Sequence, residues 1–139
     1  MKLQKNTLFA LYSVLEAASR PAQQLSTGQI ARKYRISPHH LAKVLHALAR
    51  AGIVESVRGV GGGYRFAANA KRLTLMDVIQ LFEEIGEAPR RLRRRPTDTE
   101  DALADVLAEI DEIAKATFRS ITVGTMLKLI ERRARMRAG

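Results

Sequence analysis

The sequence predicts a mainly α-helical protein with one small β-hairpin and a long C-terminal helix. Apolar residues recur at helical spacing along most of the 139-residue chain. Short stretches of alternating apolar and polar residues flank the glycine-rich segment RGVGGG, residues 58–63. Near the C-terminus an apolar stripe continues for more than two heptads. The length suits about one domain with a modest core.

The first predicted helix covers residues 3–19 and ends before Pro21, because the residue preceding a proline avoids helical geometry. A basic start followed by apolar residues is also typical of a signal peptide. Glu16 interrupts that apolar stretch, so an amphipathic helix and a cytoplasmic protein are the better interpretation. The apolar positions at helical spacing are Leu3, Leu8, Leu11, Val14 and Leu15.

Two further helices are predicted close together, as in a helix–turn–helix. Ser26 and Gln29 form an S-x-x-Q capping box that opens the first of them, TGQIARKYR. Ser37 caps the second, PHHLAKVLHALARAG, with Pro38 at the favoured first position and Gly52 as its C-terminal stop.

The second of these helices has two distinct faces. Its core stripe consists of Leu41, Val44, Leu45 and Leu48. The opposite stripe holds only hydrogen-bond donors and cations: His39, Lys43, His46 and Arg50. This pattern favours a helix that reads a DNA groove, with an ordinary solvated basic face as the alternative. His39 and His40 point about 100° apart on a helix and cannot converge with His46 on one ion, so no metal site is expected.

The glycine-rich segment is interpreted as the tip of a β-hairpin between strands at residues 53–57 and 64–66. A phosphate-binding loop would need Lys and then Ser or Thr after its last glycine, and a dinucleotide-binding loop would open a helix. Glycine permits positive φ and leaves no side chain between the backbone and a phosphate. A helix–turn–helix followed directly by such a hairpin is a winged helix. Arg58 and Arg65 add positive charge to this hairpin and are expected to contact DNA.

The charge distribution indicates a polyanionic partner. The chain carries a net charge of +10, and residues 1–72 hold the whole excess, with 12 Lys or Arg against two Glu. The remaining residues hold 12 basic and 12 acidic side chains. The N-terminal half is therefore expected to bind double-stranded DNA, although a basic surface that only promotes solubility would have the same charge.

Two more capping boxes open helices in the C-terminal half. Thr74 and Asp77 start the helix LTLMDVIQLFEE, and Thr97 and Glu100 start a long helix that runs to about residue 118. The expected core stripe of the shorter helix is Leu75, Val78, Ile79 and Phe82.

The long helix is expected to form a dimer interface, because its apolar stripe is long enough to pair with a partner helix; packing against its own domain is the alternative. The stripe consists of Leu103, Val106, Leu107, Ile110, Ile113, Ala114 and Phe118. A last helix, from residue 122 to about 136, ends in ERRARMR. Its cations suit the negative end of the helix dipole, whereas its apolar residues are too few for a membrane anchor.

The stretch ISPHHLAKVLHALARAGIVESVRGVGGGYRFA, followed by LTLMDVIQLFEE, resembles the winged-helix regulators of the IscR/NsrR/CymR type, the Rrf-two family. SVRGVGGGY is its most specific part, and the resemblance covers most of the chain. It implies a homodimeric bacterial transcription factor on a partly palindromic operator, and we expect a repressor. The recognition helix would read bases with its N-terminal part, and the wing would enter a minor groove. By position, these roles fall on Ser37, His39, His40, Lys43, Arg58, Gly59 and Gly61.

One departure from the resembled family concerns iron. Its cluster-binding members carry cysteines before the long helix, where this chain reads GEAPRRLRRRPTD, and the chain has no cysteine at all. Arginine does not ligate iron, so we expect no iron–sulfur cluster. The lack of cysteine equally excludes a cysteine redox switch, and no other cofactor is expected. The arginines form a basic loop that contacts phosphate, binds an anionic effector or is merely solvated.

The predicted organisation is a winged helix–turn–helix domain at residues 1–85, the basic loop at 86–98, and the dimerisation and C-terminal helices at 99–139. No nucleophile and base stand at a catalytic spacing, so the chain is predicted not to be an enzyme. The expected function is sequence-specific transcriptional regulation. The alternatives are an RNA-binding winged helix, for which 5% aromatic residues are few, and a protein-interaction module that has lost DNA binding.

Overall fold

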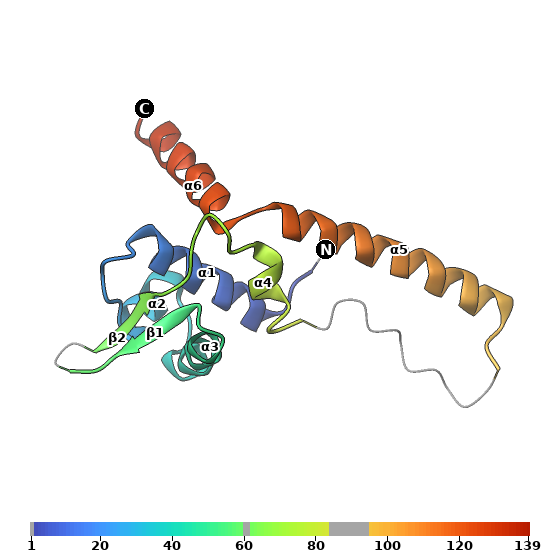
Figure 1. Ribbon diagram of the computed structural model, residues 1–139, viewed down its shortest axis with the longest axis horizontal. Helices are drawn as coiled ribbons and strands as arrows, with labels where there is room; N and C mark the ends of the chain where they lie inside the picture. Colours follow the sequence, from blue (N-terminus) through green and yellow to red (C-terminus); the bar gives the residue numbers. More distant parts are fainter. Residues whose placement is uncertain (1, 60–61, 84–94) are drawn as a thin grey trace.

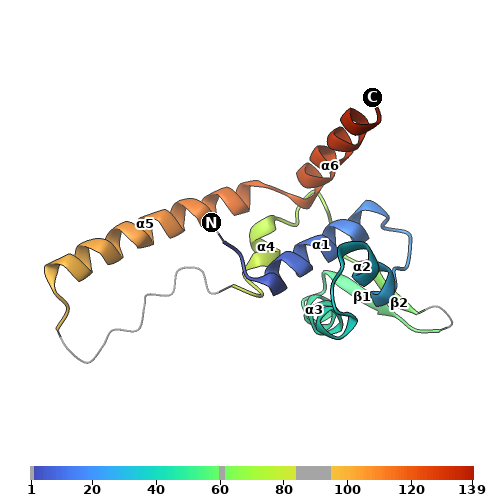
Figure 2. The ribbon, with the colours of Figure 1, turned by 180° about the vertical axis from the view of Figure 1, so that it is seen from behind.

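The computed structural model describes residues 2–59, 62–83 and 95–139. Its described residues form the predicted mainly helical fold with one hairpin (Figure 1). The elements in chain order are α1 (Lys5–Ser19), α2 (Thr27–Tyr34), α3 (Pro38–Arg50), β1 (Val54–Val57), β2 (Gly63–Phe66), α4 (Leu75–Ile79), α5 (Asp98–Ser120) and α6 (Val123–Ala138). Helices α1–α4 and the hairpin form one body, from which α5 and α6 project in different directions (Figures 1 and 2). None of the helices in the described ranges is long and apolar enough to span a membrane.

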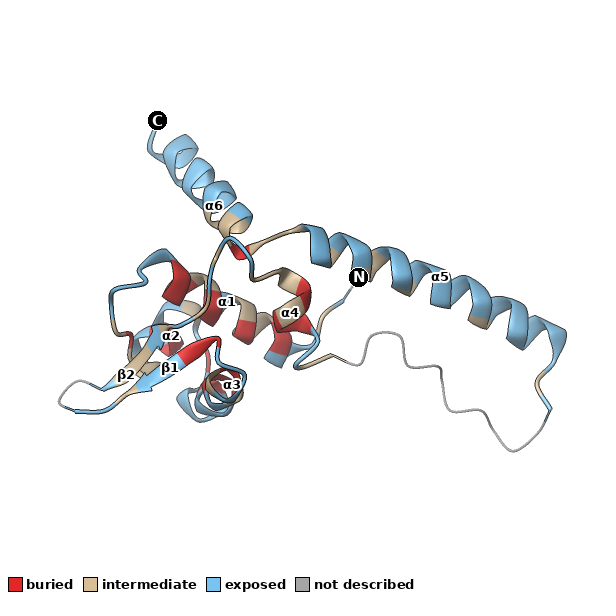
Figure 3. Cartoon of the chain, in the orientation of Figure 1, coloured by how far each residue is buried: buried red, intermediate tan, exposed pale blue. Residues whose placement is uncertain are grey.

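The core lies in this N-terminal body, around α1 (Figure 3). Helices α2, α3, α4 and α6 all contact α1. In the predicted stripe of α3, Leu41, Leu45 and Leu48 are at most 1% exposed. Burying each such leucine contributes roughly 1.5–3 kcal/mol. By contrast α5, which the structure describes along its whole length, has no buried residue.

The helix–turn–helix forms as predicted, with one difference at the start of α3. Ser26 and Gln29 make both hydrogen bonds of the capping box on α2. Arg35 ends α2 in the left-handed conformation, with φ of 57°. Ser37 occupies the N-cap of α3, but its side chain makes no capping hydrogen bond. The start of α3 relies instead on Pro38, whose fixed φ suits the first helical turn.

The hairpin pairs β1 with β2 in an antiparallel register that places Val57 opposite Gly63. Leu25, which precedes α2, bridges the other edge of β2: its N–H donates to the carbonyl of Tyr64 and its carbonyl accepts from the N–H of Tyr64, both at 2.8 Å. A Cβ on Gly63 would lie 2.3 Å from the carbonyl oxygen of Leu25. Glycine is therefore required at this position by a close approach of two backbones inside the protein.

Other positions of the wing require glycine for different structural reasons. Gly59 has φ of +121°, as expected for a residue at a hairpin turn. A Cβ on Gly62 would lie 2.8 Å from the carbonyl oxygen of Val57. Gly61, to which the family resemblance gives a role in DNA contact, lies outside the described residues.

Helix α4 is shorter than predicted. Both hydrogen bonds of the capping box form between Thr74 and Asp77, but the helix ends at Ile79. The chain continues in tighter turns of the 3₁₀ type, in which the N–H groups of residues 81 and 82 donate to carbonyls three residues earlier. The buried residues of the helix are Met76, Val78 and Ile79, whereas the expected stripe members Leu75 and Phe82 are half-buried.

Helix α6 is anchored by its first turn, while α5 extends away from the body (Figure 1). The N–H of Val123 donates to the carbonyl of Leu73 and that of Gly124 to the carbonyl of Ala70, both at 2.8 Å. The side chain of Val123 is 1% exposed. The predicted capping box of α5, between Thr97 and Glu100, forms with both hydrogen bonds.

Candidate nucleic-acid interface

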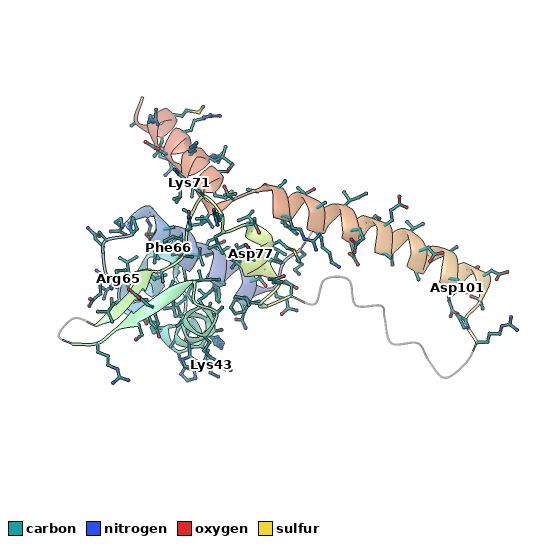
Figure 4. The ribbon with its side chains drawn as sticks, viewed as in Figure 1. Lys43, Arg65, Phe66, Lys71, Asp77 and Asp101 are labelled. Atoms are coloured by element: carbon teal, nitrogen blue, oxygen red, sulfur yellow. The ribbon has the colours of Figure 1, made fainter. Side chains whose placement is uncertain are left out.

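The polar stripe of α3 faces solvent along its whole length. Lys43 lies on the outer side of the helix, pointing away from the body (Figure 4). Because the opposite leucine stripe is buried in the core, the packing of α3 fixes which residues it presents outward. The residues of this stripe and of the helix start are all exposed: Ser37, His39, His40, Lys43, His46 and Arg50.

The hairpin carries two exposed arginines in different environments. Arg58 follows the end of β1, next to Gly59, and both are exposed. Arg65 stands opposite Glu55 across the two strands, and its Nε lies 2.8 Å from the carboxylate of that residue. The side chain of Arg65 remains 46% exposed, so the ion pair is a solvated one. Arg65 is therefore partly neutralised within the hairpin.

The α3 stripe and the hairpin form a continuous surface. A shallow depression between them is lined by His46 and Arg50 of α3 and by Ser56 and Tyr64 of the hairpin. Both elements lie on the side of the body away from α6 (Figures 1 and 2). This juxtaposition of a cationic helix and a glycine-rich hairpin suits a duplex, in which the helix enters a groove and the hairpin follows the adjacent backbone.

Glu16 anchors α2, the first helix of the helix–turn–helix, to α1. Lys33 Nζ and Tyr34 Oη each lie 2.5 Å from its Oε1, and Arg20 Nη2 lies 3.0 Å from its Oε2. Tyr34 also stacks on Tyr12, with ring centroids 4.8 Å apart. Burial raises the pKa of Glu16, but the three hydrogen bonds outweigh it and hold the pKa below its ordinary value of 4.5.

The sequence reasoning missed this cluster, because it treated Glu16 only as a break in an apolar stretch. Burial and the hydrogen bond to Glu16 raise the pKa of Tyr34, so its hydroxyl remains a donor at neutral pH. The position of Glu16 in the sequence could have predicted the cluster. A carboxylate on the buried side of an amphipathic helix requires cationic or hydrogen-bonding partners.

Glu16→Gln is expected to lower the free energy of unfolding at neutral pH by about 2 kcal/mol, because hydrogen bonds to a charged group contribute roughly 1.5–3 kcal/mol and the cations here are half exposed. Since the folded-state pKa is lowered, the stabilisation is present above the ordinary value of 4.5 and is lost as the pH falls through the folded-state pKa. Urea unfolding of both proteins at about pH 7 and about pH 3 measures the difference. An equal difference at both pH values would contradict a role for the ionised carboxylate.

A second surface, on α5, is apolar and uncovered. The exposed fractions of Leu103, Ile110 and Ile113 are 58%, 54% and 62%. Val106 and Leu107 are also exposed, and Phe118 is half-buried. Contiguous exposed apolar residues of this kind mark interaction surfaces.

The chain is similar to known transcriptional regulators along almost its whole length. The profile of the Rrf2 family, described as "Iron-dependent Transcriptional regulator", matches residues 3–129. The HTH-type regulator BadM of Rhodopseudomonas palustris, whose assignment is itself provisional, is 53% identical over 131 residues, which cover 94% of this chain and 84% of BadM. The regulator NsrR of Bacillus subtilis is 36% identical over 85 residues, 60% of this chain and 58% of NsrR.

The structure is similar to solved regulators of the same fold. CymR (YrzC), the global cysteine regulator of B. subtilis, superposes with a TM-score of 0.77 at 24% identity, covering 93% of this chain and 98% of CymR. IscR of T. potens superposes with a TM-score of 0.72 at 25% identity, covering 96% of this chain and 90% of IscR. These two likenesses extend through the winged helix and the C-terminal helices.

The residues present do not fit an iron–sulfur cluster. Such clusters need thiolate ligands, and the sequence contains no cysteine. In the parts of the chain that the structure describes, no three His, Asp or Glu side chains gather where they could hold a metal ion. The neighbouring rings of His39 and His40 have centroids 6.5 Å apart and are tilted to each other.

Proposed function

Because this chain belongs to the Rrf2 family of transcriptional regulators, we propose that it acts as a homodimeric repressor on a partly palindromic DNA operator. Like its relatives, the chain is a DNA-binding transcriptional regulator and not an enzyme. The observation that carries the proposal is the stripe of exposed donors and cations on α3, beside a hairpin that presents Arg58 and Gly59.

Each part of this surface has a proposed role on DNA. The first turns of α3 enter the major groove, where Ser37, His39, His40 and Lys43 face base edges. The wing follows the adjacent backbone or minor groove with Arg58, Gly59 and Gly61. Phosphate contacts come from His46, Arg50 and Arg65, the last after exchange of its partner Glu55 for a phosphate.

The remaining parts of the proposal concern assembly and control. The apolar stripe of α5 brings two copies together, so two recognition helices meet successive turns of one duplex face. The protein works without an iron–sulfur cluster, because it lacks thiolates. Its domains divide at the boundaries that the sequence predicts, and action on the chromosome implies a cytoplasmic location.

A salt titration tests DNA binding by this surface. The operator is first selected as the genomic DNA fragment that the purified protein retains. A regulator that makes about six phosphate contacts should lose roughly a thousandfold in affinity between about 50 and 200 mM salt. Binding should also reduce transcription from the retained promoter in a purified system. Weak binding that salt does not change would favour a protein-interaction module that has lost DNA binding.

Lys43→Ala and His39→Ala are expected to lower operator affinity by about 1–3 kcal/mol each and to relax preference at the bases they face, because a specific base contact contributes that much discrimination. Arg58→Ala should instead weaken binding to operator and random DNA alike and reduce the salt slope by about one. Fluorescence anisotropy on both duplexes measures these effects. Equal losses on operator and random DNA for the two α3 variants would exclude base reading by these side chains.

A further inference from the structure

Carboxylates are rare in the part of the chain that is proposed to bind DNA. Residues 1–83 contain only Glu16, Glu55, Asp77 and Glu83. Glu16 anchors α2, Asp77 caps α4, and Glu83 accepts a hydrogen bond from α1. Glu55 differs from these three, because it is exposed and lines the depression between α3 and the hairpin. A carboxylate at this place repels DNA phosphate, so its role lies outside the fold of the core.

Glu55 binds one of the cations that the proposed function assigns to phosphate. Arg65 lies on β2 (Figure 4), directly opposite Glu55 in the register of the hairpin. Its Nε and Nη2 both donate to the same oxygen, Oε1 of Glu55, at 2.8 and 2.5 Å. Among the residues that the structure describes, the other cations of this surface, Lys43, Arg50 and Arg58, make no ion pair. Arg65 is therefore the cation that already has an anionic partner before DNA arrives.

The carboxylate of Glu55 meets Arg65 in the way that a phosphate would. Both groups are anions that accept charge-assisted hydrogen bonds from a guanidinium. Because Nε and Nη2 already donate to Glu55, this edge of Arg65 is occupied. The side chains of Arg65 and Glu55 are 46% and 50% exposed, so a phosphate can reach the pair. An exposed ion pair is weak enough for DNA to open it, but its strength must first be overcome.

We propose that Glu55 is an internal competitor for DNA phosphate, which occupies Arg65 in the free protein and must be displaced when DNA binds. This inference rests on the proposed function and adds Glu55 as a positioning residue that acts through Arg65. Displacement costs the ion pair, whatever the base sequence of the DNA. The freed carboxylate also attracts a cation, which offsets the counterion released by the new phosphate contact. The pair therefore weakens binding to operator and random DNA by the same factor and lowers the salt dependence of both.

Glu55→Gln tests the proposal, because glutamine keeps the size of the side chain and removes its charge. Affinity for operator and random duplexes should rise alike by roughly two- to fivefold, the strength of an exposed ion pair expressed as a ratio of dissociation constants. The salt slope should become steeper by as much as about one. In an Arg65→Gln background the same substitution should have little effect, because the cation for which Glu55 competes is gone. Fluorescence anisotropy over a salt series measures this double-mutant cycle, and urea unfolding checks that each variant is folded.

Glu131→Gln is the matched control, because it frees Arg135 from an exposed ion pair of 3.1 Å on α6, on the side of the body away from the hairpin (Figures 1 and 2). It should leave DNA binding unchanged. An equal gain from Glu55→Gln with and without Arg65 would show that Glu55 only repels DNA, and the inference would be overturned. An absent gain, or a loss on the operator alone, would overturn it as well. If the wild type binds no duplex in a salt-dependent manner, the proposed function fails instead, so the two failures are distinguishable.

Discussion

Ile110→Glu is expected to convert the proposed homodimer into monomers and to lower operator affinity roughly a hundredfold or more, because a monomer loses the gain from two linked half-site contacts. Ile110 lies near the middle of α5, and its side chain is 54% exposed within one chain. A glutamate there leaves the fold of the monomer unchanged. In a dimer interface the same carboxylate would lose water without gaining a partner, which is strongly unfavourable.

Sedimentation equilibrium and binding to full and half operators measure this prediction. The matched control is Ala108→Glu, which adds the same side chain to an exposed position of α5 away from the apolar stripe. The control should remain dimeric and bind the full operator normally. A dimeric Ile110→Glu protein would show that the apolar stripe is not the interface.

Gly63→Ala is expected to lower the free energy of unfolding by about 2–3 kcal/mol, the scale of overpacking together with weakened hydrogen bonds. The added Cβ would lie 2.3 Å from the carbonyl oxygen and 2.7 Å from the carbonyl carbon of Leu25. These are backbone atoms, so relief requires β2 to move away. That movement breaks the two 2.8 Å hydrogen bonds between Leu25 and Tyr64.

Urea unfolding measures the loss, and faster hydrogen exchange at Leu25 and Tyr64 would locate it. Gly28→Ala is the matched control, because a Cβ at that position meets only the hydroxyl oxygen of Ser26, at 3.9 Å. Alanine in a helix is favoured over glycine by roughly 0.5–1 kcal/mol, so the control should be neutral or stabilising. Unchanged stability of Gly63→Ala would mean that the bridge to Leu25 does not constrain the wing.

Local signals account for the parts of the fold that could be predicted. The capping boxes at Ser26, Thr74 and Thr97 involve residues three positions apart, so the sequence contains both partners. The core stripe of α3 and the hairpin follow from periodicity in the same way. The exposed face of α3 then follows from its buried face, which is why the candidate DNA-binding residues could be named in advance.

The features that could not be predicted depend on partners distant in the chain. The partners of Glu16 lie 17 and 18 residues away on α2, at Lys33 and Tyr34. Gly63 is required by Leu25, which no local pattern connects to the hairpin. Glu83, just after α4, also has a distant partner, because its carboxylate accepts a hydrogen bond from the hydroxyl of Thr7 on α1. Helix propensity and residue spacing contain no information about contacts between residues that are far apart in the sequence.

The bridge between Leu25 and Tyr64 has a consequence for engineering altered operator preference. The bridge ties the segment before α2 to β2, so the helix–turn–helix and the wing, the two proposed DNA-contacting parts, are joined by backbone hydrogen bonds. A chimaera that receives only α3 from a relative would retain the original angle of the wing. Transplants should therefore span residues 25–66 as one segment. A shorter graft would exchange the base-facing side chains but would keep the original orientation of the wing relative to α3.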